Sequence, residues 1–253
     1  MTKHRFEEIL LPTGWAGDQV VETDMDGSIL SVSPAPENSI LPLIRGAAVP
    51  GMPNLHSHAF QRAMAGLAER AGPGADSFWT WRQVMYGFVE KLTPEDVEAI
   101  ATNLYREMLK AGYTAVAEFH YLHHAADGTP YDNIAEMGER IASAANTTGI
   151  GLTLCPVLYA HGGFGGAAAG HGQRRFLNDA ERYLRLLEGC GKAVQGLNGG
   201  RLGIAPHSLR AVTGDLLGDV LAASDEITGN GPVHIHIAEQ MKEVDDCLIW
   251  SGQ

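Results

Sequence analysis

The sequence predicts an α/β fold on a parallel β-sheet, of the (β/α)8 TIM-barrel kind, with about five βα units present. Three observations carry this prediction. From Ala47 onward, strand-like runs alternate with segments of helical periodicity, a pattern typical of βαβ units. The run Ile150–Leu158 is continuously apolar, as in a strand buried on both faces of a parallel sheet. The length of 253 residues is near the roughly 250 that one complete barrel needs.

Residues 1–46 precede the barrel and predict a small β domain. The short runs Gln19–Glu22 and Ser28–Val32 flank the turn sequence DMDG at residues 24–27, which is typical of a hairpin. The expected domains are therefore residues 1–46 and residues 47–253. Because the first segment uses part of the length, only five barrel strands fit in the remainder. We therefore expect the chain to be a fragment of a longer protein.

The barrel elements are predicted from periodicity and end signals. Strands are expected at Ala47–Leu55, Thr114–Phe119, Ile150–Leu158, Leu202–Pro206 and Val233–Ile237. Helices are expected near Phe60–Ala71, Phe78–Lys91, Thr93–Gly112, Ile134–Ala145, Asn178–Leu187, Thr213–Ala223 and Met241–Trp250. The helix at Thr93 has Pro94 in its first turn, and its apolar residues recur at three- and four-residue steps.

The composition is that of a globular protein, with 45% hydrophobic and 19% charged residues. A formal net charge of −12 argues against nucleic acids and anionic membranes as partners. The three cysteines are widely spaced and form no CxxC pair, so a disulfide framework is not expected. The N-terminal residues lack the apolar stretch of a signal peptide, and the expected compartment is the reducing cytoplasm.

Histidines occur in pairs at two predicted strand ends. His56 and His58 end the first barrel strand, and His234 and His236 lie in the fifth. Residues two apart on a strand point to the same side, and the strand ends of a barrel meet at one mouth. His56, His58 and His236 are therefore candidate ligands of a hydrolytic metal ion, with Glu239 as the group that shuttles protons. His234 lies one pleat deeper and is expected to support the site or belong to the core.

Other histidines are harder to interpret. His207 ends the fourth predicted strand, and it is either part of the same mouth or a buried residue at the strand-to-helix turn. His120, His123 and His124 follow the second strand, where three imidazoles suggest a second metal. Because His123 and His124 adjoin a polar loop, we expect them to be solvated and assign them no role.

Four motifs together resemble the amidohydrolase superfamily. They are PGMPNLHSHAFQR at residues 50–62, EFHYLHH at 118–124, APHSLRAV at 205–212 and HIHIAEQ at 234–240. Within the superfamily they are most similar to the formimidoylglutamate deiminases of bacterial histidine degradation, and the resemblance extends over essentially the whole chain. It implies that His56, His58 and His236 bind one divalent metal ion, zinc by default, and that Glu239 transfers protons. Binuclear relatives carry a bridging Lys or Glu where this sequence has His207, which is why a single ion is implied.

The resemblance also implies substrate contacts at Gln61, Arg82, Tyr121, His207 and Arg210. The implied reaction is metal-dependent hydrolysis of N-formimino-L-glutamate to N-formyl-L-glutamate and ammonia. This small substrate carries two carboxylates, and arginine is the side chain best suited to bind carboxylates through paired hydrogen bonds. Residues 1–46 would then be the N-terminal part of a small β-sandwich domain.

The chain departs from the family in one respect. A histidine on strand six and an aspartate on strand eight have no counterpart here, so a fragment of this length is expected to be inactive alone. Two alternatives stay open: another mononuclear deaminase acting on a purine or pterin ring, and a noncatalytic metal-binding module. Relatives often form homodimers, although no residue of this sequence marks an interface.

Overall fold

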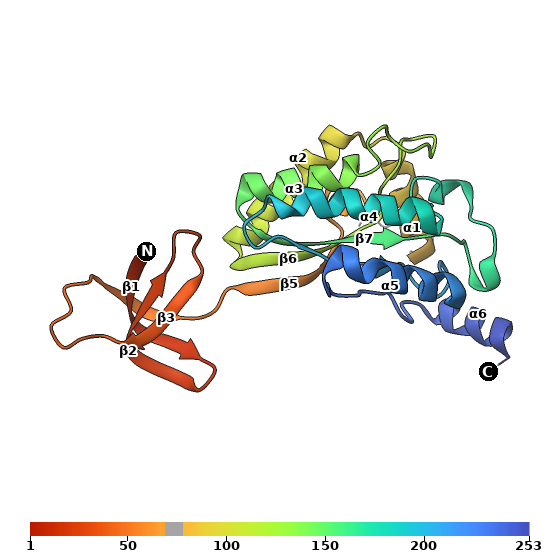
Figure 1. Cartoon of the computed structure of the whole chain (residues 1–253). Helices are drawn as coiled ribbons and strands as arrows, with labels where there is room; N and C mark the ends of the chain where they lie inside the picture. The colour runs from red at the N-terminus through yellow and green to blue at the C-terminus, as the bar shows by residue number, and fades with distance from the viewer. Residues whose placement is uncertain (69–77, 253) are drawn as a thin grey trace. The chain divides into compact units, whose positions relative to one another are not determined.

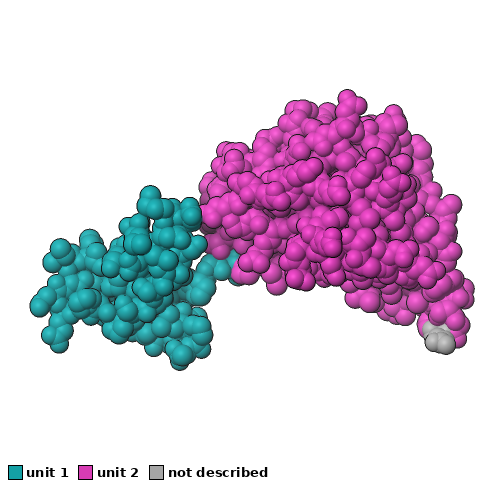
Figure 2. Space-filling view, in the orientation of Figure 1, with its two compact units in different colours: residues 1–52 teal, residues 53–253 magenta. Residues whose placement is uncertain are grey.

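The computed structural model describes residues 1–68 and 78–252. The chain divides into two compact units, Met1–Met52 and Pro53–Gln253, which Figure 2 draws in teal and magenta. The division falls inside the run Ala47–Leu55, which the sequence predicts as one strand. The structure has two strands there, β4 (Leu43–Ala48) in the first unit and β5 (Met52–Ser57). Pro50 lies between them and has no N–H to continue a ladder, which explains the interruption.

The first unit contains a four-stranded sheet in the order β3-β2-β1-β4. β1 (Thr2–Leu11) pairs antiparallel with β2 (Gly14–Thr23), which pairs antiparallel with β3 (Ile29–Pro34). The predicted hairpin is thus confirmed as β2 and β3, and the Asp24 carboxylate in its turn accepts hydrogen bonds from the backbone N–H groups of Asp26 and Ser28. Strand β1 and its parallel pairing with β4 were not predicted.

The second unit contains a sheet in the order β5-β6-β7-β8, with β9 also paired to β7. β6 (Tyr113–His120) and β7 (Gly151–Leu158) are parallel, as are the pairings of β7 with β8 (Arg201–Leu202) and β9 (Ala205–Pro206). Helices α2 (Pro94–Lys110), α3 (Glu136–Thr148) and α4 (Ala180–Gln195) run along one face of β6 and β7 (Figure 1). The predicted α/β fold with a parallel sheet is confirmed.

The fourth and fifth predicted strands are less regular than the sequence predicts. Leu202–Pro206 is split into β8 and β9, and Val233–Ile237 forms no regular strand. Its residues lie beside the fourth strand through one isolated parallel bridge, Ile204 to Val233, and through scattered backbone hydrogen bonds. Pro206 and Pro232 each lack an N–H donor, so each removes one hydrogen bond from a regular ladder at this position.

The remaining helical elements are η1 (Ala59–Met64), α1 (Phe78–Val89), η2 (Phe164–Gly166), η3 (His171–Gln173), α5 (Gly214–Thr228) and α6 (Met241–Ser251). The helix predicted near Phe60–Ala71 is a short 3-10 helix, η1, and residues 69–71 lie outside the described part. Among the described helices, none combines the length and apolarity needed to cross a bilayer.

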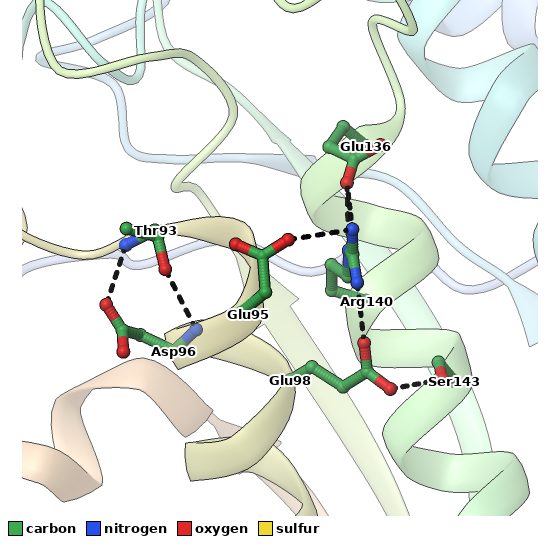
Figure 3. A network of polar contacts seen from close by, with 7 residues as sticks. All are labelled: Thr93, Glu95, Asp96, Glu98, Glu136, Arg140 and Ser143. Carbon is green, nitrogen blue, oxygen red and sulfur yellow. Dashed lines mark hydrogen bonds and ion pairs between the residues drawn. The ribbon is translucent and has the colours of Figure 1, made fainter.

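Polar contacts at the start of α2 and between α2 and α3 hold these helices in place (Figure 3). Thr93 and Asp96 form a reciprocal capping box: the Thr93 hydroxyl accepts from the Asp96 N–H, and the Asp96 carboxylate accepts from the Thr93 N–H. Arg140 of α3 donates to three carboxylates, those of Glu95, Glu98 and Glu136. The Arg140 side chain thereby ties α3 to α2. Both helices belong to the layer that covers one face of the sheet.

Candidate metal centre and active site

Three imidazoles converge at the carboxyl ends of the parallel strands. His56 is the penultimate residue of β5, His58 directly follows that strand, and His236 comes from the irregular segment beside β9. The His56 Nε2 atom lies 3.1 Å from His58 Nε2 and 3.0 Å from His236 Nε2. In the described part of the chain this is the one group of three potential ligands whose atoms all lie within 4.8 Å of one another. The predicted triad is therefore brought together by the fold.

The three imidazoles are prepared to act as neutral ligands. Burial lowers the pKa of His58 to about 4 and that of His236 to about 3, and it also lowers the pKa of His56. His58 Nδ1 lies 2.9 Å from the Phe119 carbonyl oxygen, so it carries the proton and donates it there. The lone pair of His58 is then on Nε2, which faces the other two histidines.

The donor set fits a single tetrahedral ion. An ion about 2.0–2.1 Å from three imidazole nitrogens holds them roughly 3.3–3.4 Å apart, close to the separations of His56 from the other two. The Phe119 ring stacks on His236, with centroids 4.2 Å apart, and it also contacts His56 and His58. Three neutral nitrogens with an apolar ring beneath them are suited to zinc more than to calcium or magnesium, which prefer oxygen ligands.

Glu118 lies next to Phe119 on β6 and is completely buried. Its Oε1 accepts from the Ala59 N–H at 2.6 Å, its Oε2 accepts from the Tyr105 hydroxyl at 3.1 Å, and the Ser57 side chain bonds to it as well. Burial raises the pKa of this carboxyl group to about 7 in spite of those bonds. Glu118 lies in the motif EFHYLHH, but no role was predicted for it.

Glu239 is exposed at the rim of the site. The preceding residue, Ala238, has a φ of 54°, in the left-handed region that a residue with a Cβ rarely adopts. This turn carries the chain from His236 to Glu239. The Glu239 N–H donates to the carboxylate of Glu243 at 3.3 Å. Although the residue as a whole is exposed, partial desolvation of its carboxyl group beside the cavity raises the pKa of Glu239, and the nearby Arg210 and Arg82 oppose that rise.

One cavity of about 100 Å³ joins these groups. It is lined by the predicted residues His58, Gln61, Arg82, Tyr121, His207, Arg210, His236 and Glu239, together with Trp81, Met85, Tyr86, Tyr159 and Phe176. Every predicted substrate contact thus lies in the wall of a single cavity. Gln61 Nε2 donates to the Tyr121 hydroxyl at 2.5 Å, which joins the segment after His58 to the end of β6.

The two arginines of the cavity are each held by a neighbour. Arg82 Nε donates to the Tyr86 hydroxyl at 2.5 Å, one turn further along α1. Arg210 Nε lies 3.6 Å from Glu243 Oε2, and both side chains are almost fully buried. Arg82 and Arg210 give the cavity a local positive charge within a protein of net charge −12.

His207 lies between the metal centre and Tyr159, which with Phe176 and Trp81 forms an aromatic wall of the cavity. Its ring centroid is 4.9 Å from that of His236 and 4.5 Å from that of Tyr159. Burial, with His236 and Arg210 nearby, holds the pKa of His207 well below its usual range. His207 is therefore a neutral hydrogen-bonding group at pH 7, and it belongs to the same mouth as the metal centre.

The structure corrects the expectation that His123 and His124 are solvated. His120, His123 and His124 are all completely or nearly completely buried. His123 Nε2 lies 2.9 Å from the Val157 carbonyl oxygen and His124 Nε2 lies 2.9 Å from that of Leu177. Each carbonyl oxygen satisfies one ring nitrogen of His123 or His124 in the interior, and none of the three histidines joins the metal-binding group or the cavity lining.

His234 is half-buried and lies outside the group of three ligand nitrogens. Sequence reasoning missed the aromatic wall, Glu118 and Glu243. Trp81 comes from α1, Tyr159 directly follows β7 and Phe176 lies in a loop, and the three share no local motif. Glu243 stands in the first turn of α6 whereas Glu239 precedes that helix, so no helical spacing in the sequence links the two carboxylates.

Comparison with known proteins decides the family. The model of the amidohydrolase family matches residues 47–251, most of the chain. The chain belongs to the amidohydrolase family. This amidohydrolase is 56% identical over 247 residues to formimidoylglutamate deiminase of Pseudomonas aeruginosa, a match that covers 98% of this chain and 54% of that protein.

Two further relatives place the amidohydrolase in context. It is 28% identical to 8-oxoguanine deaminase of the same organism, over 92% of this chain and 50% of that protein. The crystal structure of an amidohydrolase from Brucella melitensis superposes with a TM-score of 0.91 at 55% identity, covering 100% of this chain and 55% of that one. The chain therefore spans about half the length of the relatives it matches.

Proposed function

We propose that the full-length protein containing this chain is a metal-dependent hydrolase that deiminates N-formimino-L-glutamate to N-formyl-L-glutamate and ammonia. The observation that carries the proposal is the single cavity that holds His58 and His236, Glu239, and two arginines suited to carboxylates. The 56% identity to a formimidoylglutamate deiminase supports the same substrate.

The proposed roles follow from the contacts. His56, His58 and His236 hold one divalent ion, for which zinc is the best match, and the chemistry that such an ion supplies when bound is activation of water at neutral pH. Glu239 accepts a proton from the attacking water and delivers it to the formimino nitrogen as the C–O bond forms and the carbon becomes tetrahedral. Transfer of the remaining hydroxyl proton to the same nitrogen then accompanies cleavage of the C–N bond, which forms the carbonyl group and releases ammonia. Ammonia and the formyl product then account for all atoms of the substrate and the water.

The remaining lining residues bind and orient the substrate. Arg82 and Arg210 receive its carboxylates, each with its guanidinium steadied by Tyr86 or Glu243. Gln61 and Tyr121, which are bonded to each other, and the neutral imidazole of His207 supply hydrogen bonds near the formimino group. Because His207 stays uncharged at pH 7, it does not compete with the arginines for the carboxylates.

The same proposal includes the complete fold, the metabolic role, the location and the assembly of the protein. The parallel sheet of the second unit is taken as about five units of a (β/α)8 barrel, and residues 1–46 as part of a small β-sandwich. We further propose a role in histidine degradation, a cytoplasmic location and a homodimeric assembly, with neither nucleic acid nor membrane as a partner. The free thiols of Cys155 and Cys190, both buried, support the reducing compartment.

A purine deaminase is the second candidate. The aromatic wall of Tyr159, Phe176 and Trp81 could stack on a flat ring, and 8-oxoguanine deaminase is a relative at 28% identity. Two arginines in so small a cavity favour an acyclic dianion instead.

The test uses the full-length protein and measures ammonia release from N-formimino-L-glutamate and, separately, from guanine and 8-oxoguanine. We expect turnover of the first alone, abolished by a chelator and restored by zinc. Release from a purine would support the second candidate. Activity that persists after removal of the metal would contradict the mechanism, and a metal-binding protein with no turnover would support a noncatalytic module.

A further inference from the structure

The residue directly before His58 and the residue directly after it both bond to the same buried carboxylate. Ser57 precedes His58 and Ala59 follows it; the Ala59 N–H donates to Glu118 Oε1 at 2.6 Å, and the Ser57 side chain bonds to the same group. We propose that Glu118 is a positioning residue of the metal centre, which holds the backbone around His58 so that its Nε2 atom faces His56 and His236. This inference rests on the proposed metal centre.

The neighbouring residue of β6 holds the imidazole itself. The Phe119 carbonyl oxygen lies 2.9 Å from His58 Nδ1, and the Phe119 ring packs against His56, His58 and His236. Consecutive residues of one strand therefore hold both the backbone and the ring of His58. Since β6 is an inner strand of the sheet, paired with β5 and β7, it is a rigid template for the ligand segment.

The chemistry of Glu118 argues for a role beyond packing. It is 0% exposed, and the three groups that bond to it are neutral: a backbone N–H and two hydroxyls. Burying a carboxyl group without a cation is costly, and an apolar side chain of similar volume often serves stability better. A carboxylate, however, offers two acceptor oxygens in fixed directions, and one of them faces the His58 segment.

The two oxygens have separable functions, which makes the proposal testable. Oε1 accepts from Ala59, beside the ligand, whereas Oε2 accepts from Tyr105 of α2, away from it. Loss of the Tyr105 hydroxyl removes a bond to Glu118 without touching the ligand segment. Glu118→Gln keeps an amide oxygen for the Ala59 N–H and presents its amide nitrogen to the hydroxyls.

The experiment measures the rate at which zinc leaves the zinc-loaded, full-length protein for a chromophoric chelator, alongside melting temperature. Loss of a group that orients a metal ligand usually lowers metal affinity about 10- to 100-fold. We expect Glu118→Leu to show this loss as zinc release about 10- to 100-fold faster than in the unsubstituted protein. Glu118→Gln and Tyr105→Phe should stay close to the unsubstituted rate. Ser57→Ala, which removes one tether and leaves the carboxylate, should show a smaller acceleration and carries the test if Glu118→Leu does not fold.

Tyr183→Phe is the control for a general loss of stability. The buried Tyr183 hydroxyl donates to the Pro156 carbonyl oxygen at 2.8 Å. It lies in the same core but is not among the groups that bond to Glu118 or to His58. Unaltered zinc release in Glu118→Leu and Ser57→Ala, or equal acceleration in Tyr183→Phe, would overturn the positioning role. If the protein with intact His56 binds no more zinc than His56→Ala, the metal centre and with it the proposed function fail instead.

Discussion

The Nε2 atoms of His56 and His236 lie 3.0 Å apart although 180 positions separate the two residues in the sequence. His56 lies near the end of β5 and His236 belongs to the irregular segment beside β9, so the contact forms only when the parallel sheet is assembled. The metal centre is thus a product of the tertiary fold and depends on residues at both edges of the sheet.

Removing a ligand and removing the proton shuttle should have different consequences. In the full-length protein, His56→Ala should lose both bound metal and turnover, because only two of the three imidazole ligands remain. Glu239→Ala should keep the metal and lose about 10²–10⁴-fold in kcat, because general acid–base transfer is lost. Metal content by atomic absorption and kcat by ammonia release measure the two effects. His234→Ala is the matched control, and a loss of metal there would make His234 a ligand.

Tyr86→Phe should weaken substrate binding through Arg82. The Tyr86 hydroxyl accepts a hydrogen bond from Arg82 Nε. Burial raises the pKa of Tyr86 to about 12, so the hydroxyl stays protonated at neutral pH. Loss of a hydrogen bond to a charged group is worth about 1.5 kcal/mol, which corresponds to roughly a tenfold rise in KM with little change in kcat. In an Arg82→Lys background, which lacks Nε–H, the same substitution should have no further effect. An equal rise in KM in both backgrounds would show that Tyr86 does not act on substrate binding through Arg82.

The left-handed backbone of Ala238 should tolerate glycine and reject a β-branched residue. Glycine adopts a φ of 54° without penalty, so Ala238→Gly should keep kcat and metal content. A β-branched side chain is a true outlier there, and Ala238→Val should shift Glu239. A displacement of about 1 Å can cost up to 100-fold in rate, so kcat should fall by tenfold or more with the metal retained. Unchanged kcat in Ala238→Val would mean that this turn does not aim Glu239.

Glu98 should stabilise the protein at neutral pH and lose that effect in acid. Bonds from Ser143 and Arg140 lower the pKa of Glu98 in the folded protein (Figure 3). Its contribution is therefore complete above the unfolded pKa, near 4.3, and disappears as the pH falls through the lower folded pKa. Glu98→Gln should cost about 1 kcal/mol in the free energy of unfolding at pH 7, since the pair is partly exposed.

Urea titrations at pH 7 and near pH 3 measure this difference. The gap between Glu98→Gln and the unsubstituted protein should shrink at the lower pH. Asp26→Asn, at an exposed position in a turn outside this network, is a suitable control for a change of charge alone. A gap that stays the same at both pH values would show that the carboxylate charge of Glu98 does not contribute.

Much of the fold could be predicted because its signals are local. The capping residue Thr93 and the continuously apolar β7 are read from neighbours in the chain. Prediction fails where pairing is decided at a distance: β4 joins the first sheet, and the segment near His236 pairs with the fourth strand through only one isolated bridge. The buried state of His123 and His124 was missed because their partners are carbonyl groups of distant segments.

By itself the sequence determined which residues could hold a metal ion, because the HxH and HxxE spacings place imidazoles and a carboxylate at strand ends. It could not determine what surrounds them. Glu118, Glu243 and the aromatic wall are ordinary residues in the sequence, and only the tertiary structure brings them to the cavity. The physical reason is that backbone periodicity acts over a few residues, whereas burial and the pKa values it shifts depend on every segment packed around a group.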